Sequence, residues 1–284
     1  MFKENKMKHK ILSLLSCSLI ITVGAASANN AETAPSETAQ AETALVETVS
    51  GETVPVEAEL SAIELLKASD KARGGGLPGI QWKMDLVTVR PKRDDLRQAF
   101  EVIALEENSL ATTVFPKRMA GGKLLQVEKN MWFAQPDLRK PISISSRQKI
   151  SGPAANGDIA ATNYALDYDA EIIGVEDFNG QPAYVLNLTA KNKWVTYDQV
   201  KYWISKNDLV ALKAEFYTVS GKLFKSATFE TNNILNFNDE DIPFISKMLI
   251  IDALGSGSES TLVYTDVEIV SLSPSDFSRA SLTR

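Results

Sequence analysis

Histidine and cysteine are almost absent from this chain. Its 284 residues contain one of each, His9 and Cys17, and both lie within the first 28 residues. That segment has the three parts of a secretory signal: a lysine-rich start, an apolar run from Ile11 to Gly24, and the cleavage sequence Ala26-Ser27-Ala28. We therefore expect residues 1–28 to be a signal peptide that is removed after Ala28, and the mature protein to be periplasmic.

Two other interpretations of the leader stay open. One is a retained membrane anchor, although an apolar run of about 14 residues is shorter than the roughly 20 that span a bilayer. The other is lipid modification, because Leu14-Leu15-Ser16-Cys17 is similar to a lipoprotein box. In that case the protein would be anchored through Cys17.

The missing residues exclude several classes of chemistry from the mature protein. Without histidine or cysteine it has no Ser-His-Asp triad, cysteine nucleophile, disulfide, iron–sulfur cluster, or zinc site with nitrogen or sulfur ligands. Neighbouring acids occur at Asp94-Asp95, Glu106-Glu107 and Asp239-Glu240-Asp241, in expected turns where adjacent side chains point in different directions. We therefore expect no catalytic residue, no metal site and no cofactor.

A repeat with a period of five follows the leader. Glu32, Glu37, Glu42, Glu47, Glu52 and Glu57 recur at equal spacing, and the segment has no basic or aromatic residue. A period of five matches neither a helix nor a strand, so no sustained apolar face forms. We expect residues 29–59 to be a disordered acidic linker, either a tether or wall spacer or a segment without a specific partner.

Neither sign of charge is in large excess in the remainder, residues 60–284. The precursor has 30 basic and 36 acidic residues, and after removal of the leader and the linker 26 basic and 28 acidic residues remain. A nearly neutral body offers no basic field for nucleic acid and no polybasic membrane patch. Its length is sufficient for one large domain.

Period-two alternation dominates this body and predicts about eleven strands. Ile80, Trp82, Met84 and Leu86 alternate with polar residues, and Asn179-Gly180 is typical of a hairpin turn. Candidate segments for these strands lie near residues 96–102, 110–114, 124–127, 131–134, 142–144, 172–178, 184–188, 200–205, 210–219, 222–230, 247–253 and 261–270.

Only three helical segments are expected. Ser61–Arg73 has one apolar stripe and ends at Gly74, Asp158 is placed to cap a helix that reaches Leu166, and Ser273-Pro274 begins a last one. The predicted fold class is therefore mainly β (α+β): a single curled antiparallel sheet forming a half-open barrel covered by a few helices.

Several local sequences resemble the LolA-like outer-membrane lipoprotein-sorting proteins. They are the leading helix that ends at Lys71-Ala72-Arg73, the stretch from Leu124 through Asn130–Pro136, the Ser220-Gly221-Lys222 hairpin, and the ending from Leu262 to Ser278. The similarity extends over residues 60–282. It departs at Asn156-Gly157-Asp158-Ile159, where many relatives have Gly-Ser-Asp followed by an aromatic residue and further acids.

The resemblance implies a periplasmic carrier or accessory protein, a monomer whose apolar cavity binds a lipid, an acyl chain or a lipoprotein. An inner-membrane exporter of the resistance–nodulation–division type or an outer-membrane acceptor is the implied partner. The expected cavity residues are Trp82, Met84, Phe100, Val102, Met131, Trp132, Phe133, Ile142, Ile144 and Tyr164.

Two other functions stay open from the residues alone. One is a non-catalytic envelope module that docks a partner protein through its sheet. The other is a carboxylate-dependent hydrolase. The acidic residues are adjacent in sequence, and this spacing argues against a pair of catalytic carboxylates. A dry cavity favours the carrier, and a filled interior with an exposed apolar patch favours the docking module.

Overall fold

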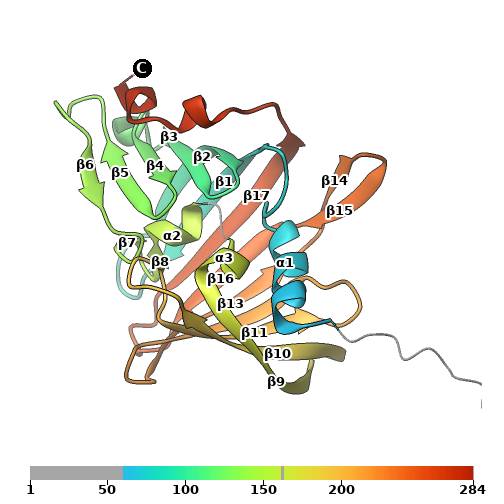
Figure 1. Cartoon of the computed structure of the whole chain (residues 1–284). Helices are drawn as coiled ribbons and strands as arrows, with labels where there is room; N and C mark the ends of the chain where they lie inside the picture. Colours follow the sequence, from blue (N-terminus) through green and yellow to red (C-terminus); the bar gives the residue numbers. More distant parts are fainter. Residues whose placement is uncertain (1–59, 161–162, 284) are drawn as a thin grey trace, which may run out of the picture. The chain divides into compact units, whose positions relative to one another are not determined.

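A computed structural model describes residues 60–160 and 163–283 (Figure 1). The expected signal peptide and pentad linker lie outside the described residues. Thirteen antiparallel strands form one sheet in the order β6-β5-β4-β3-β2-β1-β17-β16-β13-β12-β11-β10-β9. The sheet curls without closing, so β6 and β9 are its edges. The predicted fold class is confirmed, with thirteen strands in place of about eleven.

The first half of the sheet runs from β1 to β6. Its strands are β1 (Ile80–Val89), β2 (Leu96–Leu105), β3 (Asn108–Phe115), β4 (Lys123–Val127), β5 (Asn130–Ala134) and β6 (Ile142–Ile144). The second half contains β9 (Tyr168–Phe178), β10 (Gln181–Ala190), β11 (Gln199–Ser205), β12 (Ala211–Tyr217), β13 (Leu223–Glu230), β16 (Lys247–Asp252) and β17 (Glu259–Ile269). β17 pairs with β1 and joins the two halves.

Two small hairpins were not predicted from the sequence. β14 (Asn233–Phe237) pairs with β15 (Glu240–Phe244), and β7 (Lys149–Ser151) pairs with β8 (Ala154–Ala155). The first turns at Asn238 and Asp239, which both have positive φ. These strands have two to five residues, too few for a clear alternation. The acids of this hairpin, Asp239-Glu240-Asp241, occupy its turn and the exposed start of β15.

The leading helix α1 (Ala62–Lys71) forms as the sequence predicts. The backbone N–H of Ser61 donates to Glu64 Oε2 at 2.9 Å, which caps the first turn. Gly74 adopts a φ of +98° just beyond the end, a conformation that glycine tolerates best. The helix buries Leu65 and Leu66 completely against the sheet.

The middle helix differs from the prediction. Two four-residue helices, α2 (Asn156–Ile159) and α3 (Tyr164–Asp167), replace the single helix from Asp158 to Leu166. Ala160 has extended backbone after α2, which ends that helix. Asp158 is the third residue of α2, and Asn163 is the N-cap of α3.

The C-terminal segment consists of two 3₁₀ helices, η2 (Pro274–Phe277) and η3 (Arg279–Thr283), and a third, η1 (Lys117–Met119), follows β3. The Ser273 N–H donates to Asp276 Oδ2 at 2.8 Å, so the predicted helix start is confirmed. Leu110, Leu125, Ala134, Phe277 and Leu282 form a separate buried cluster on this side of the sheet.

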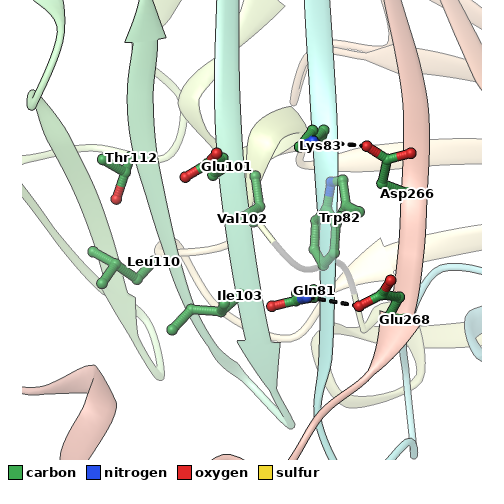
Figure 2. A pocket seen from close by; sticks show the side chains of 10 residues that line it. All are labelled: Gln81, Trp82, Lys83, Glu101, Val102, Ile103, Leu110, Thr112, Asp266 and Glu268. Carbon is green, nitrogen blue, oxygen red and sulfur yellow. Dashed lines mark hydrogen bonds and ion pairs between the residues drawn. The ribbon is translucent and has the colours of Figure 1, made fainter.

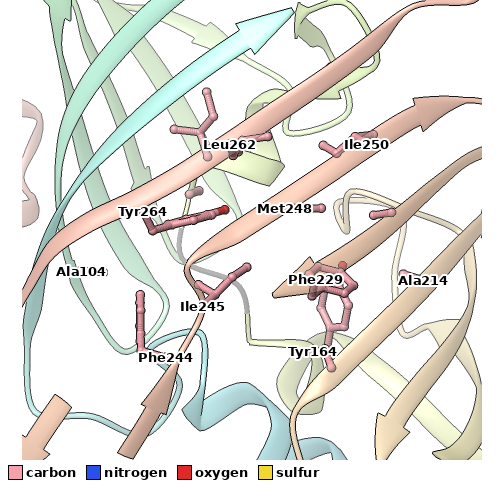
Figure 3. Packing of buried hydrophobic residues seen from close by; sticks show 14 of the residues in the cluster. Ala104, Tyr164, Ala214, Phe229, Phe244, Ile245, Met248, Ile250, Leu262 and Tyr264 are labelled. Atoms are coloured by element: carbon pink, nitrogen blue, oxygen red, sulfur yellow. The ribbon is translucent and has the colours of Figure 1, made fainter. Parts of the chain in front are cut away.

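The main core lies on the other face of the sheet, where α1, α2 and α3 cover it (Figure 1). Strand residues such as Ala214, Phe229, Met248 and Leu262 pack there with Tyr164 of α3 (Figure 3). We call this space the interior. Because strand side chains alternate between faces, every second residue of the central strands points into it.

Candidate functional site

The interior brings together six of the ten predicted cavity residues. Trp82, Met84, Phe100, Val102, Met131 and Tyr164 are all buried members of the main core. The register explains the first four, because Met84 pairs with Phe100 and Trp82 pairs with Val102 across β1 and β2. Paired residues on neighbouring strands share one face of the sheet.

The other four predicted residues lie nearer the edge or on the opposite face. Ile144 is half-buried and packs against the main core. Phe133 and Ile142 pair with each other across β5 and β6, where Phe133 is half-buried and Ile142 is 49% exposed. Trp132 packs instead against the cluster of Phe277 and Leu282. The structure therefore separates Trp132 from the interior, since it directly follows Met131 on a strand.

Buried side chains of the described residues pack closely together in the interior. A small, partly open hollow in it has a volume of about 10 Å³, and it is lined by Arg73, Trp82, Asp158, Ile159, Ala160, Phe244, Ile245 and Tyr264. This is room for a single water molecule at most.

A buried ion pair connects α2 to the sheet. Lys225 of β13 binds Asp158 Oδ2 at 2.7 Å, and the Tyr197 hydroxyl donates to Asp158 Oδ1 at 2.6 Å. Lys225 also contacts the Tyr197 hydroxyl and donates to the Pro153 carbonyl at 3.1 Å. Burial lowers the pKa of Lys225 and raises the pKa of Tyr197. The charges satisfy each other, so α2 is held in one position.

Sequence reasoning missed this ion pair, although a signal for it exists. Lys225, Ala227 and Phe229 alternate along β13, and all three face the interior. A lysine in register with buried apolar residues indicates a buried charge that requires a partner. The sequence marks Asp158 as a helix cap and as part of the segment that departs from the LolA-like pattern, but it does not indicate Lys225 as its partner.

Polar groups also connect α1 to α3. Asp70 Oδ2 accepts a hydrogen bond of 2.8 Å from the Ala165 backbone N–H. The Arg73 guanidinium lies 5.3 Å from the ring centre of Tyr164 and 5.2 Å from that of Phe229. The Tyr164 ring also meets those of Tyr168 and Tyr202 edge to face. Asp70 and Arg73 thus hold α3 in place over the sheet.

Hollows also lie outside the interior, and two of them are described next. A groove of about 440 Å³ runs over the outer face of β1, β2, β3 and β17 (Figure 2). There Lys83 forms an exposed ion pair of 2.8 Å with Asp266, and Gln81 donates to Glu268 at 2.9 Å. A cleft of about 530 Å³ lies between α1 and α3.

The described residues contain no group of three His, Cys, Asp or Glu side chains that could hold a metal ion. None of the helices in residues 60–160 and 163–283 is long and apolar enough to cross a bilayer.

Comparison with known proteins agrees with this architecture. A family model described as "-like: Uncharacterized protein" matches residues 106–284. No curated protein matches the chain significantly. The structure is similar to a LolA superfamily protein from Nitrosomonas europaea, with a TM-score of 0.71 and 29% identity, covering 78% of this chain and 100% of that one.

Two other solved structures show the same fold at lower identity. An outer membrane lipoprotein-sorting protein domain from Vibrio parahaemolyticus has a TM-score of 0.67 and 23% identity, covering 78% of this chain and 98% of the other. A DUF1329 family protein from Desulfovibrio piger has a TM-score of 0.66 and 21% identity, covering 78% and 97%. The chain therefore belongs to the family whose model matches residues 106–284, and its body is LolA-like, as the sequence resemblance predicted.

Proposed function

We propose that this protein is a periplasmic carrier or accessory protein that binds lipidated or apolar cargo in its interior. The observation that carries the proposal is the arrangement of one continuous apolar sheet face beneath three short helices. The similar structures include one described as an outer membrane lipoprotein-sorting domain. Burying an acyl chain is favourable by about 0.8 kcal/mol per CH₂ group, so transport requires binding and release without a catalytic group.

Because the interior is closely packed, such a carrier must open to bind its cargo. In this proposal the described arrangement is the closed form, and the side chains that pack with α1, α2 and α3 stand in the space that the cargo would take. Opening exposes the apolar sheet face to an acyl chain, which replaces the helices as its cover. The two polar connections, Asp158 with Lys225 and Asp70 with Ala165, are the contacts that opening breaks.

Uptake of a fluorescent fatty-acyl probe by the mature protein tests this function. Met131→Ala enlarges the interior, and because an apolar cavity stays dry, we expect this variant to bind the probe about tenfold more tightly than the wild type. Leu125→Ala is the matched control, because Leu125 is equally buried but belongs to the cluster beneath the C-terminal segment. We expect that control to leave probe affinity unchanged.

A docking module for a partner protein is the second candidate, and two observations favour it. The interior is filled, and edge strand β9 exposes Ile172, Ile173 and Val175. An unpaired edge with exposed apolar side chains can accept an added strand. If neither the wild type nor Met131→Ala takes up the probe, the carrier proposal is wrong and the docking module replaces it.

A further inference from the structure

Basic residues gather at one end of the sheet, around the β1–β2 turn and η1. Residues 89–97 and 114–119, which we call the basic rim, contain two acidic and six basic side chains: Arg90, Lys92, Arg93, Arg97, Lys117 and Arg118. All six are exposed except Arg90, which is half-buried and donates to the Asp94 carbonyl at 3.1 Å. The basic rim therefore has a net charge of +4, whereas residues 60–284 as a whole have a net charge of −2.

The fold brings the two segments of the basic rim together. Phe115 of β3 pairs with Ala99 of β2, and Arg97 is two residues before Ala99 on the same face of that strand. A hollow of about 510 Å³ opens at this place, lined by Asp95, Leu96, Arg97, Phe115, Pro116 and Arg118. A nearly neutral total thus hides a local excess of charge. The expectation that the body has no polybasic patch does not hold for this end of the sheet.

The charges of the basic rim are not neutralised by the rest of the described chain. None of its six basic side chains forms an ion pair with a carboxylate of residues 60–160 or 163–283. By contrast, Lys83 on the neighbouring outer surface pairs with Asp266. Clustered cations repel one another, so an anionic partner that lies against them gains free energy.

Large apolar side chains are exposed among these charges. Val89, Val114 and Phe115 are 47%, 43% and 49% exposed. A soluble acidic partner needs only the cations, whereas a bilayer surface accommodates both kinds of side chain. Basic groups lie at its anionic head groups, and apolar side chains enter the boundary of the acyl chains. The combination therefore favours a bilayer as the partner.

The opposite ends of the same strands carry the opposite charge. The β2–β3 turn consists of Glu106 and Glu107, and the β4–β5 turn consists of Glu128 and Lys129. An anionic surface attracts the basic rim and repels these turns, so it orients the molecule with the basic rim toward the surface.

We propose that the basic rim docks the protein on a bilayer surface that contains anionic phospholipid. The arginine and lysine side chains lie at the lipid phosphates, and Phe115, Val89 and Val114 lie at the acyl boundary. This docking goes beyond the carrier function and does not depend on it, because Phe115 and Arg97 are on the outer face of the sheet, away from the interior.

Sedimentation of the mature protein with vesicles tests the docking. The vesicles consist of phosphatidylcholine with and without phosphatidylglycerol. We expect at least about tenfold tighter binding when phosphatidylglycerol is present, and weaker binding as salt is added. Arg97→Gln/Arg118→Gln should weaken binding to the anionic vesicles about tenfold. Lys92→Gln/Arg93→Gln removes two other charges of the basic rim and should do the same, which keeps the test decisive if the first pair fails to fold by circular dichroism.

Matched variants separate the basic rim from the charge and apolar surface of the whole protein. Lys67→Gln/Lys71→Gln makes the same change of charge at exposed positions of α1, on the other face of the sheet, and should leave binding unchanged. Phe115→Ser should weaken binding about fivefold. Ile234→Ser is its control, because Ile234 is 59% exposed on β14, outside the basic rim.

Three results overturn the proposal. They are equal binding to both kinds of vesicle, an equal loss in the α1 variant, and a loss in the arginine variant without one in Phe115→Ser. In the last case the basic rim attracts anions in general, and a soluble acidic partner replaces the bilayer. Uptake of the fatty-acyl probe measures the interior and should be unchanged in all these variants, so failure of the docking and failure of the carrier function are distinguishable.

Discussion

Individual polar residues control how the helices sit on the sheet. Asp158 and Lys225 are 4% and 2% exposed, so neither charge is solvated by bulk water. Each is tolerated because the other is present and because Tyr197 and backbone groups complete the hydrogen bonds. A change to one partner therefore affects stability more than a change to both.

We expect Lys225→Met to lower the free energy of unfolding by about 3–5 kcal/mol, because it leaves the Asp158 carboxylate buried without a cation. Adding Asp158→Asn removes that charge and keeps an oxygen for Tyr197, so the double variant should be more stable than Lys225→Met alone. Urea denaturation measures both. Lys222→Met, on the surface, should change stability by less than about 0.5 kcal/mol. A double variant that is less stable than the single one contradicts this account.

Asp70 makes stability depend on pH. Burial raises the pKa of its carboxyl to about 7, the nearby Arg73 opposes this rise and Asp167 adds to it. The folded state therefore binds a proton more tightly than the unfolded state, whose aspartates have a pKa of about 3.9. The contribution of Asp70 to stability is present below pH 4 and is lost as the pH rises to about 7.

We expect urea midpoints measured from pH 4 to pH 8 to show this loss in the wild type. Asp70→Asn cannot titrate, so the decline between pH 4 and pH 7 should be smaller in that variant. An equally steep decline in Asp70→Asn would assign the pH dependence to other groups.

At the scale of elements, alternation along β5 directs its side chains into two different hydrophobic clusters. Met131 faces the interior, and Trp132 faces η2 and η3, where the Arg279 guanidinium lies 5.7 Å from its ring centre. The C-terminal segment is therefore the cover of the outer face of β3 and β4. It stabilises the sheet without contributing to the interior.

Phe277→Ala tests this role. Phe277 is 3% exposed in the outer cluster, so we expect a loss of about 3 kcal/mol in the free energy of unfolding. Uptake of the fatty-acyl probe should not change. Ser275→Ala, an exposed position in the same 3₁₀ helix, is the control for stability. Loss of probe binding in Phe277→Ala would show that the two cores are coupled.

At the scale of the whole molecule, the sheet-and-helix body and the acidic pentad segment are expected to be independent. The seven glutamates of residues 29–59 have no basic partner within that segment. Deleting residues 29–56 should therefore leave the midpoint of thermal unfolding within about 1 °C of that of the mature protein. A drop of several degrees would show that the segment packs on the body. Mass spectrometry of the exported protein, expected to begin at Asn29, establishes the starting point for this comparison.

The sequence by itself determined the fold class and most of the strands. Period-two alternation identifies Trp82, Met84, Phe100 and Val102 as one face of a sheet, and Asn179-Gly180 identifies the β9–β10 hairpin. These features are local, because the side of the sheet to which a strand residue points and the type of a two-residue turn both depend on residues that are adjacent in the chain. The LolA-like resemblance then supplied the curled sheet covered by helices.

Only the tertiary structure decided what each face contacts. Alternation places Met131 and Trp132 on opposite sides, but the cover over Trp132 comes from Phe277, nearly 150 residues later. The partner of Asp158 is Lys225, 67 residues away, and Asp70 meets Ala165 across 95 residues. Burial and charge pairing are sums over such distant neighbours, which no local pattern contains. The filled interior and the cleft beside α1 were therefore visible only once the chain was folded.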